Sequence, residues 1–205
     1  MKTTKNIFYI SLVSLFALNI ISCAKDEEHS STSTTTSDNT TSDNIPELFV
    51  TWGNSGTILT SSDNGTTWDN RTSGTSNLLY GVNAVTYGNN TFVTVGDSGT
   101  ILTSNDSISW TSRTHTSNAL KGVNDGKSTF VVVGESGTIL TSFDGASWTS
   151  RTSGTSNDLW GVAFANNTFV VVGTSGTILT SSDGTTWDER TSGTTNTLWG
   201  VTYSQ

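Results

Sequence analysis

The chain contains one cysteine and one proline among its 205 residues, and it has few basic side chains. A single cysteine allows no disulfide within the chain, so the fold must be held together by burial of apolar surface. Lys and Arg number 9 against 17 Asp and Glu, which gives a formal net charge of −8. This balance argues against nucleic acid and against anionic lipid as partners, because both require a basic face.

Histidine is also scarce, since only His29 and His115 are present. His29 lies in a polar segment that is not expected to fold, which leaves one folded histidine. One histidine supports neither a metal cluster nor a histidine-based catalytic triad. The sequence therefore predicts no metal and no cofactor.

Residues 1–23 are predicted to be a processing signal. Lys2 and Lys5 give a positive start, and residues 7–21 form an apolar run too short to span a bilayer comfortably. The run Ile-Ile-Ser-Cys at residues 20–23 resembles the lipobox of bacterial lipoproteins. In that family the signal is cleaved before the cysteine, which is then acylated, so the resemblance implies a lipid anchor on Cys23. The alternative is a plain signal peptide with an incidental cysteine.

Residues 24–47 are predicted to be a disordered tether, because residues 30–44 are nearly all Ser, Thr and Asp and cannot bury enough apolar area to offset their ordering entropy. By resemblance to the lipoprotein sorting rule, Ala24 after the cysteine favours the outer membrane. The sequence Lys-Asp-Glu-Glu at residues 25–28 is similar to a tag that some Gram-negative groups use for the outer surface. The alternative for these four residues is a solvated charge run.

Residues 48–205 form an internal repeat. One unit has four β-branched or apolar runs, at residues 159–164, 168–172, 177–181 and 186–190, separated by turn sequences such as Asn-Asn and Asp-Gly. Four short antiparallel strands per unit are typical of a propeller blade. The segment Gly-Thr-Ile-Leu-Thr-Ser marks the four copies at Gly56, Gly99, Gly137 and Gly176. We therefore predict an all-β fold, a small β-propeller of four four-stranded antiparallel blades.

The phase of the repeat suggests how the ring closes. The first copy begins with a second strand at residues 48–53, and residues 198–203 have the sequence of a first strand. We expect this C-terminal strand to complete the first blade, which would also remove exposed sheet edges. A monomer is expected, and the alternative is that two chains exchange this strand to form a larger ring. Residues 79–92 carry extra residues just before the first strand of the second blade.

A Ser-x-Asp-x-Gly-x-x-Trp sequence runs from Ser61 to Trp68, and altered copies follow in the other units. It resembles the Asp-box (BNR repeat) of bacterial neuraminidase-type propellers, sortilin-like receptors and photosystem II assembly factors. The Asp is expected to accept hydrogen bonds from its own turn, the Gly to supply a positive φ, and the Trp to cover apolar area. Calcium binding is the alternative. The positions are Asp63 and Trp68, Asp106 and Trp110, Asp144 and Trp148, and Asp183 and Trp187.

No catalytic residue is expected. Sialidases need an arginine triad and an Arg-Ile-Pro motif, whereas this chain has no Arg-Ile-Pro and its folded arginines share one repeated position. Asp97 and Glu135 are a candidate carboxylate pair, because they occupy equivalent places in the Gly-x-Ser-Gly turns of neighbouring units. The alternative is that both are solvated turn residues. The repeated arginines form either a basic rim or hydrogen bonds to loop carbonyls; they are Arg71, Arg113, Arg151 and Arg190.

Positions that vary between the units give a candidate binding face. Exposed aromatic and amide groups near a propeller axis suit carbohydrate or peptide recognition. The alternative is that Trp160 and Trp199 pack between blades. The face comprises Tyr80 (or Asn83), Lys121, Trp160 and Trp199, together with Asp97 and Glu135.

These observations favour a non-enzymatic surface lipoprotein that binds a protein or glycan partner. The first alternative is an assembly or scaffolding factor for a membrane complex, as the resemblance to photosystem II assembly factors implies. The second is a degenerate glycosidase.

Overall fold

The computed structural model describes residues 48–79, 85–113 and 115–204. The expected signal peptide with Cys23, the expected tether and Tyr80 lie outside these residues. Within the described segments, no helix has the length and apolar character needed to cross a membrane.

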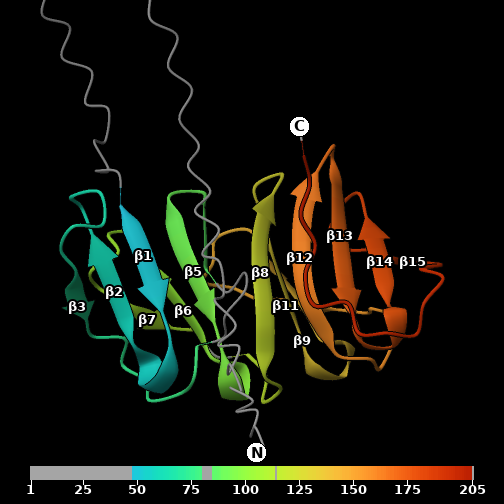
Figure 1. Ribbon diagram of the computed structural model, residues 1–205, viewed down its shortest axis with the longest axis horizontal. Coiled ribbons are helices and arrows are strands. Elements are labelled where there is room, and N and C mark those ends of the chain that lie inside the picture. Colours follow the sequence, from blue (N-terminus) through green and yellow to red (C-terminus); the bar gives the residue numbers. More distant parts are fainter. Residues whose placement is uncertain (1–47, 80–84, 114, 205) are drawn as a thin grey trace, which may run out of the picture. The chain divides into compact units, whose positions relative to one another are not determined.

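Four antiparallel sheets follow one another in sequence order (Figure 1). The first has three strands and the other three have four each. The expected all-β class and the array of four blades are confirmed. Blade 1 contains β1 (Phe49–Trp52), β2 (Ile58–Ser61) and β3 (Asp69–Arg71); blade 2 contains β4 (Val85–Gly88), β5 (Thr91–Val95), β6 (Ile101–Ser104) and β7 (Thr111–Ser112); blade 3 contains β8 (Leu120–Gly126), β9 (Thr129–Gly134), β10 (Ile139–Ser142) and β11 (Thr149–Arg151); blade 4 contains β12 (Leu159–Ala165), β13 (Thr168–Gly173), β14 (Ile178–Ser181) and β15 (Asp188–Arg190).

The hairpin between the first two strands of blade 4 has the turn that its sequence predicts. Ala165 pairs with Thr168, so Asn166 and Asn167 alone form the loop. Their φ angles are 47° and 60°, as a type I′ turn requires at both central positions. Asparagine tolerates this left-handed conformation better than most residues, which is why the Asn-Asn pair signals the turn.

The fourth strand of blade 4 starts later than the sequence indicates. We expected it from residue 186, whereas β15 begins at Asp188. The backbone N–H groups of Thr185 and Thr186 donate to Oδ1 of Asp183, at 2.8 and 3.0 Å. These two residues therefore belong to the turn, because their donors are not available to the neighbouring strand.

A short 3-10 turn joins the second and third strands of blades 2, 3 and 4, and the equivalent strands β1 and β2 of blade 1. In blade 3 it is η3 (Glu135–Gly137), where Ser136 and Gly137 have φ angles of 55° and 68°. A Cβ on Gly137 would lie 2.0 Å from the carbonyl oxygen of Thr155, so only glycine fits this position. The equivalent turns are η1 (Asn54–Gly56), η2 (Asp97–Gly99) and η4 (Thr174–Gly176).

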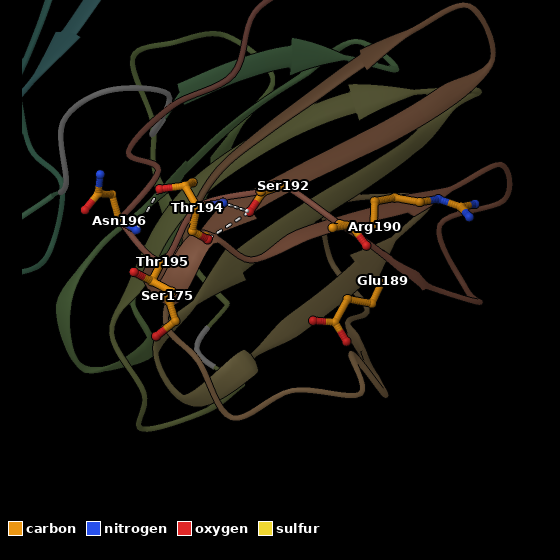
Figure 2. A pocket seen from close by; sticks show the side chains of 10 residues that line it. Ser175, Glu189, Arg190, Ser192, Thr194, Thr195 and Asn196 are labelled. Carbon is orange, nitrogen blue, oxygen red and sulfur yellow. Dashed lines mark hydrogen bonds between the residues drawn. The ribbon is translucent and has the colours of Figure 1, made fainter.

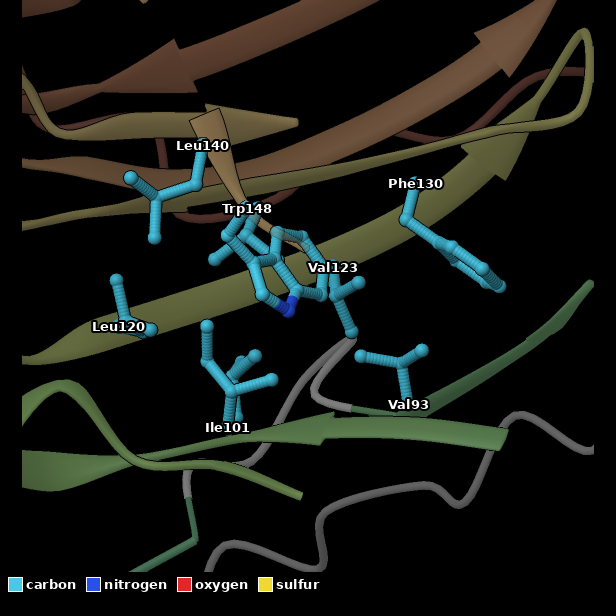
Figure 3. Close-up of a cluster of buried hydrophobic side chains, with 9 residues drawn as sticks. Val93, Ile101, Leu120, Val123, Phe130, Leu140 and Trp148 are labelled. Carbon is cyan, nitrogen blue, oxygen red and sulfur yellow. The ribbon is translucent and has the colours of Figure 1, made fainter. Parts of the chain in front are cut away.

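Buried apolar side chains join each blade to the next. Figure 3 shows one such cluster, in which Val93 and Ile101 of blade 2 pack with Phe130 and Trp148 of blade 3. A second cluster joins blades 3 and 4, and a third joins blades 1 and 2. Among the described residues, no buried cluster joins blade 4 to blade 1.

Blades 2 and 3 share a polar contact that the other blades lack within the described residues. The hydroxyl of Thr86 on β4 donates to Oδ1 of Asp125 on β8, at 2.8 Å. In blades 2 and 4 the place of Asp125 is taken by the aromatic residues Tyr87 and Phe164, which pair with the opposite strand. The first strand of blade 3, which contains Lys121, Asn124 and Asp125, therefore pairs like the other first strands and places a carboxylate between blades.

Blade 1 has a place for a fourth strand beside β1. In the described sheets β1 pairs only with β2. The backbone N–H of Leu198 donates to the carbonyl oxygen of Gly173 at 2.9 Å, as Leu120 does to Gly96 at 3.0 Å. The C-terminal segment therefore lies beside blade 4 where a first strand of a following blade belongs.

Two glycines of blade 3 test the close contact in the turn. Gly137→Ala forces a Cβ onto the Thr155 carbonyl and should destabilise the protein by about 3 kcal/mol or more. Gly154→Ala is the matched control, because Gly154 has a φ of 80° but nothing within 4 Å of the position that a Cβ would take. The control should lose only about 1–2 kcal/mol, the cost of the left-handed backbone. Urea unfolding measures both, and equal losses would contradict the role given to the contact.

Candidate binding face

A β-bulge places the variable residue of the first strand in blades 3 and 4. The pairing of β8 with β9 shifts between Leu120 and Gly122, and that of β12 with β13 shifts between Leu159 and Gly161. Lys121 and Trp160 are the extra residues at these two shifts. A bulge leaves its extra residue outside the ladder and redirects its side chain. The sequence identified these positions by their variability, but it gave no sign of the bulge.

The bulged residues contact one another from blade to blade. Nζ of Lys121 lies 5.2 Å from the ring centroid of Trp160, in a cation–π arrangement. The ring centroids of Trp160 and Trp199 are 4.7 Å apart, with an angle of 59° between the ring planes. Three of the candidate face residues thus form one continuous series, which we call the bulge ladder (Lys121, Trp160 and Trp199).

Glycine makes this series possible because it lets neighbouring first strands approach closely. A Cβ on Gly122 would lie 3.0 Å from the carbonyl oxygen of Trp160, and one on Gly161 would lie 3.0 Å from Cα of Gly200. Any larger residue would push the strands apart and separate the rings. The Gly after each variable residue is therefore a packing requirement.

Exposure rises along the bulge ladder. Lys121 is only 5% exposed, Trp160 is half-buried, and Trp199 is 61% exposed. The indole Nε1 of Trp160 is buried and has no hydrogen-bond partner among the described residues. Packing between blades, the alternative weighed for the two tryptophans, accounts for the Trp160–Trp199 contact but leaves most of Trp199 open to a ligand.

The structure separates the roles of Asp97 and Glu135. Oε1 of Glu135 forms an ion pair with Nζ of Lys121 at 2.9 Å, so the carboxylate neutralises a nearly buried ammonium group. Asp97 lies in the equivalent turn η2. Among the described residues no hydrogen bond or ion pair joins the two carboxylates. Glu135 therefore belongs with the bulge ladder.

The aspartates of the Asp-box-like turns are held by local hydrogen bonds. In blade 1, Oδ1 of Asp63 accepts from the backbone N–H of Thr67 at 2.9 Å, and the Thr67 hydroxyl donates to Oδ2 at 2.6 Å. These bonds, the hydroxyl first, lower the pKa of Asp63 to about 2. In blade 2 the backbone N–H groups of Ser109 and Ile108 lower the pKa of Asp106 to about 2.

The same arrangement recurs in blades 3 and 4, where donors within each turn lower the pKa of Asp144 and of Asp183. The indoles of the first three units also donate to their turns, as Trp148 does from Nε1 to the carbonyl oxygen of Gly145 at 3.0 Å. Nε1 of Trp187, in contrast, is buried and has no hydrogen-bond partner among the described residues. Trp148 is 8% exposed, whereas Trp68 is 43% exposed. Within the described chain no group of three or more His, Cys, Asp or Glu is arranged to hold a metal ion.

The repeated arginines bond to a partner that the sequence analysis did not consider. Nε of Arg151 donates to the hydroxyl of Thr141 on the adjacent strand at 2.8 Å. Arg71, Arg113 and Arg190 make the same bond to Thr60, Thr103 and Thr180. The hypothesis of bonds to loop carbonyls was therefore wrong for this nitrogen. Arg151 pairs with Ile139, and its side chain reaches the threonine two residues further along the same strand.

Sequence comparison with models of known protein families and with curated proteins finds no match. Solved structures do share the fold. A structure described as YCF48 bound to D1 peptide superposes with a TM-score of 0.58 at 18% identity, over 76% of this chain and 54% of that one. YCF48 from Cyanidioschyzon merolae gives 0.58 at 18% identity, over 79% and 57%. The computationally designed Ika8 protein gives 0.52 at 16% identity, over 76% and 52%. The chain thus spans about half the length of these structures.

The ion pair of the bulge ladder can be tested through stability. Glu135→Gln removes the charge that faces Lys121 and should destabilise the protein by about 1–2 kcal/mol, less than for a fully buried pair because the Glu135 side chain is 42% exposed. Asp97→Asn, at the equivalent turn position, should change the unfolding free energy by less than about 0.5 kcal/mol. Urea unfolding compares the two variants. An unchanged unfolding free energy in Glu135→Gln would show that the ion pair does not stabilise the protein.

Proposed function

We propose that this protein is a non-enzymatic surface lipoprotein whose β-propeller binds a protein or glycan partner through the bulge ladder. The observation that carries the proposal is the pairing of the exposed Trp199 ring with Trp160 at 4.7 Å, beside the buried Lys121. An exposed aromatic side chain held against a second ring offers a large contact area at little cost in side-chain entropy. The structure described as YCF48 bound to D1 peptide supports a protein partner, because a protein of similar fold binds a peptide in it.

The proposal includes completion of blade 1 by a strand with the sequence of residues 198–203. Blades 2 and 4 each stack an aromatic pair between their first two strands, Tyr87 with Phe92 and Phe164 with Phe169, both at 4.5 Å between ring centroids. Tyr203 and Phe49 occupy the corresponding places, and Tyr203 is 54% exposed. Pairing these strands would place Tyr203 against Phe49 and remove an exposed sheet edge.

The second candidate is an assembly or scaffolding factor for a membrane complex. It is favoured by the peptide-bound YCF48 structure and by the Asp-box-like turns, which resemble those of photosystem II assembly factors. Protease treatment of intact cells separates the two proposals. A surface binding module would be degraded, whereas a factor on the periplasmic side would be protected until the outer membrane is opened.

Capture of a partner tests the binding proposal directly. Residues 43–205, which form one compact unit, would be probed on a glycan array and used to capture proteins from solubilised membranes of the source organism. Trp199→Ala should weaken binding of the recovered partner by about tenfold or more, as for a central aromatic contact. Trp68→Ala, an exposed tryptophan of an Asp-box-like turn, should leave binding unchanged. Recovery of no partner by either route would contradict the proposal.

The anchor is tested separately. Cys23→Ser should abolish incorporation of labelled fatty acid and release the protein from the membrane fraction, because the remaining chain has no acylation site of this kind. Ala24→Ser, a neighbouring change of similar size, should leave labelling intact. Retained labelling in Cys23→Ser would show that the lipobox interpretation is wrong.

A further inference from the structure

An asparagine after the fourth strand ties each blade to the next. The side-chain amide of Asn157 donates to the hydroxyl of Thr177 in blade 4 at 2.8 Å. The equivalent bonds run from Asn77 to Thr100 at 2.8 Å and from Asn118 to Thr138 at 2.9 Å. A backbone bond accompanies each one, as from the N–H of Thr174 to the carbonyl oxygen of Asp158 at 2.9 Å. We call this pair of bonds the blade joint.

The repeat contains one more donor and one more acceptor for such a joint. Asn196 holds the asparagine position at the end of blade 4, and Thr57 holds the threonine position in blade 1. Neither makes the joint bond within the described residues. An open hollow of about 780 Å³ beside η4 is lined in part by Asn196, Thr194 and Ser192. Figure 2 shows these side chains. This hollow lies beside Asn196, where a following blade would complete the joint. We call Asn196 and Thr57, each without its joint partner in the described residues, the two half-joints.

The strand edges at the two half-joints match in the same way. In blade 4 the first strand pairs with the second through Val162 with Val171, Ala163 with Val170 and Phe164 with Phe169. By the same register, Val201, Thr202 and Tyr203 would pair with Thr51, Val50 and Phe49. The segment already rests on blade 4 through Leu198 and Gly200, and the sole partner that it lacks within the described chain is a second strand.

Within the described chain, β1 of blade 1 and residues 198–203 beside blade 4 are not paired with one another. Each successive pair of blades shares a buried cluster, yet none joins blade 4 to blade 1 in the described residues. The array superposes on solved structures with TM-scores of 0.52 to 0.58 while covering only 52% to 57% of their length. About three quarters of this chain therefore superposes on roughly half of each of those structures.

We propose that two copies of this chain close one ring, each giving residues 198–203 to blade 1 of the other. The contact is of the head-to-tail kind, with different surfaces on the two copies, and such a contact ends in a closed ring when two copies complete the rotation. The ring would contain two arrays of four blades, with every Asn–Thr joint made. This inference extends the completion of blade 1 proposed above and names the copy that supplies the strand.

Disulfide trapping between two differently tagged full-length chains, co-expressed and purified in mild detergent, tests the proposal. One chain carries Val50→Cys and the other Thr202→Cys, positions whose Cβ atoms would lie about 4.5–5.5 Å apart across an antiparallel pair. Oxidation should join the two tags in one band. Asn70→Cys, exposed on β3 and two strands away, replaces Val50→Cys as the matched control and should give at least about tenfold less product. Wild-type chains, which carry only Cys23, set the baseline.

The outcomes separate this inference from the proposed function. Suppose that Val50→Cys and Thr202→Cys in one chain give only a disulfide within that chain, and that mixed chains give none. Blade 1 is then completed by the C-terminal segment of its own chain, and the two-copy proposal is overturned. If neither disulfide forms, the completion of blade 1 is overturned as well. Neither result depends on partner capture, so failure of the binding proposal would be recognised independently.

A joint variant supplies a second measurement on chains that remain folded. Asn196→Ala removes one donor from each contact between copies and should weaken association about tenfold per contact, the effect of one lost hydrogen bond. Asn118→Ala, in the joint between blades 2 and 3, should lower stability without changing the number of chains per particle. Sedimentation in detergent would show two chains for wild type and for Asn118→Ala; a single chain in wild type would overturn the proposal.

Discussion

The array depends on one close contact, that of a left-handed glycine with the loop that follows the fourth strand of its blade. In blade 3 the backbone N–H of Gly137 donates to the carbonyl oxygen of Asn157 at 2.9 Å, and the same Asn157 reaches Thr177 of blade 4. Asn157 thus accepts from the turn of its own blade through its carbonyl oxygen and donates to the next blade through its side-chain amide. The geometry within a blade therefore fixes the geometry between blades, and the bulge ladder inherits its spacing from it.

Periodicity explains how much of this fold the sequence could predict. The strands and the Asn166–Asn167 turn follow from local patterns, which is why their bounds agree closely with the structure. The end of the Asp183 turn was missed because its hydrogen bonds draw two further residues out of the strand. The bulge at Lys121 was missed because one extra residue in a short strand leaves no mark in an alternating pattern.

The candidate site was predictable as positions but not as contacts. Variation between otherwise similar units singled out Lys121, Trp160 and Trp199. The ion pair of Lys121 with Glu135 joins a first strand to a turn after the second, and no sequence spacing specifies which carboxylate approaches. The blade joints were also missed, although the asparagine recurs in every unit as Asn77, Asn118, Asn157 and Asn196 and thus carried a usable signal.

Near-identical units allow strands from the wrong units to pair during folding. Any first strand can pair with any second strand in the same register, so a chain could assemble its blades out of order and become trapped. The bond from Thr86 to Asp125 distinguishes one pair of neighbours from all others in the described array. Because Ala163 takes the place of Thr86 in blade 4, placing blade 3 after blade 4 would leave the Asp125 carboxylate without this donor. The hydrogen bond from Thr86 to Asp125 thus favours the correct order of blades 2 and 3 during folding.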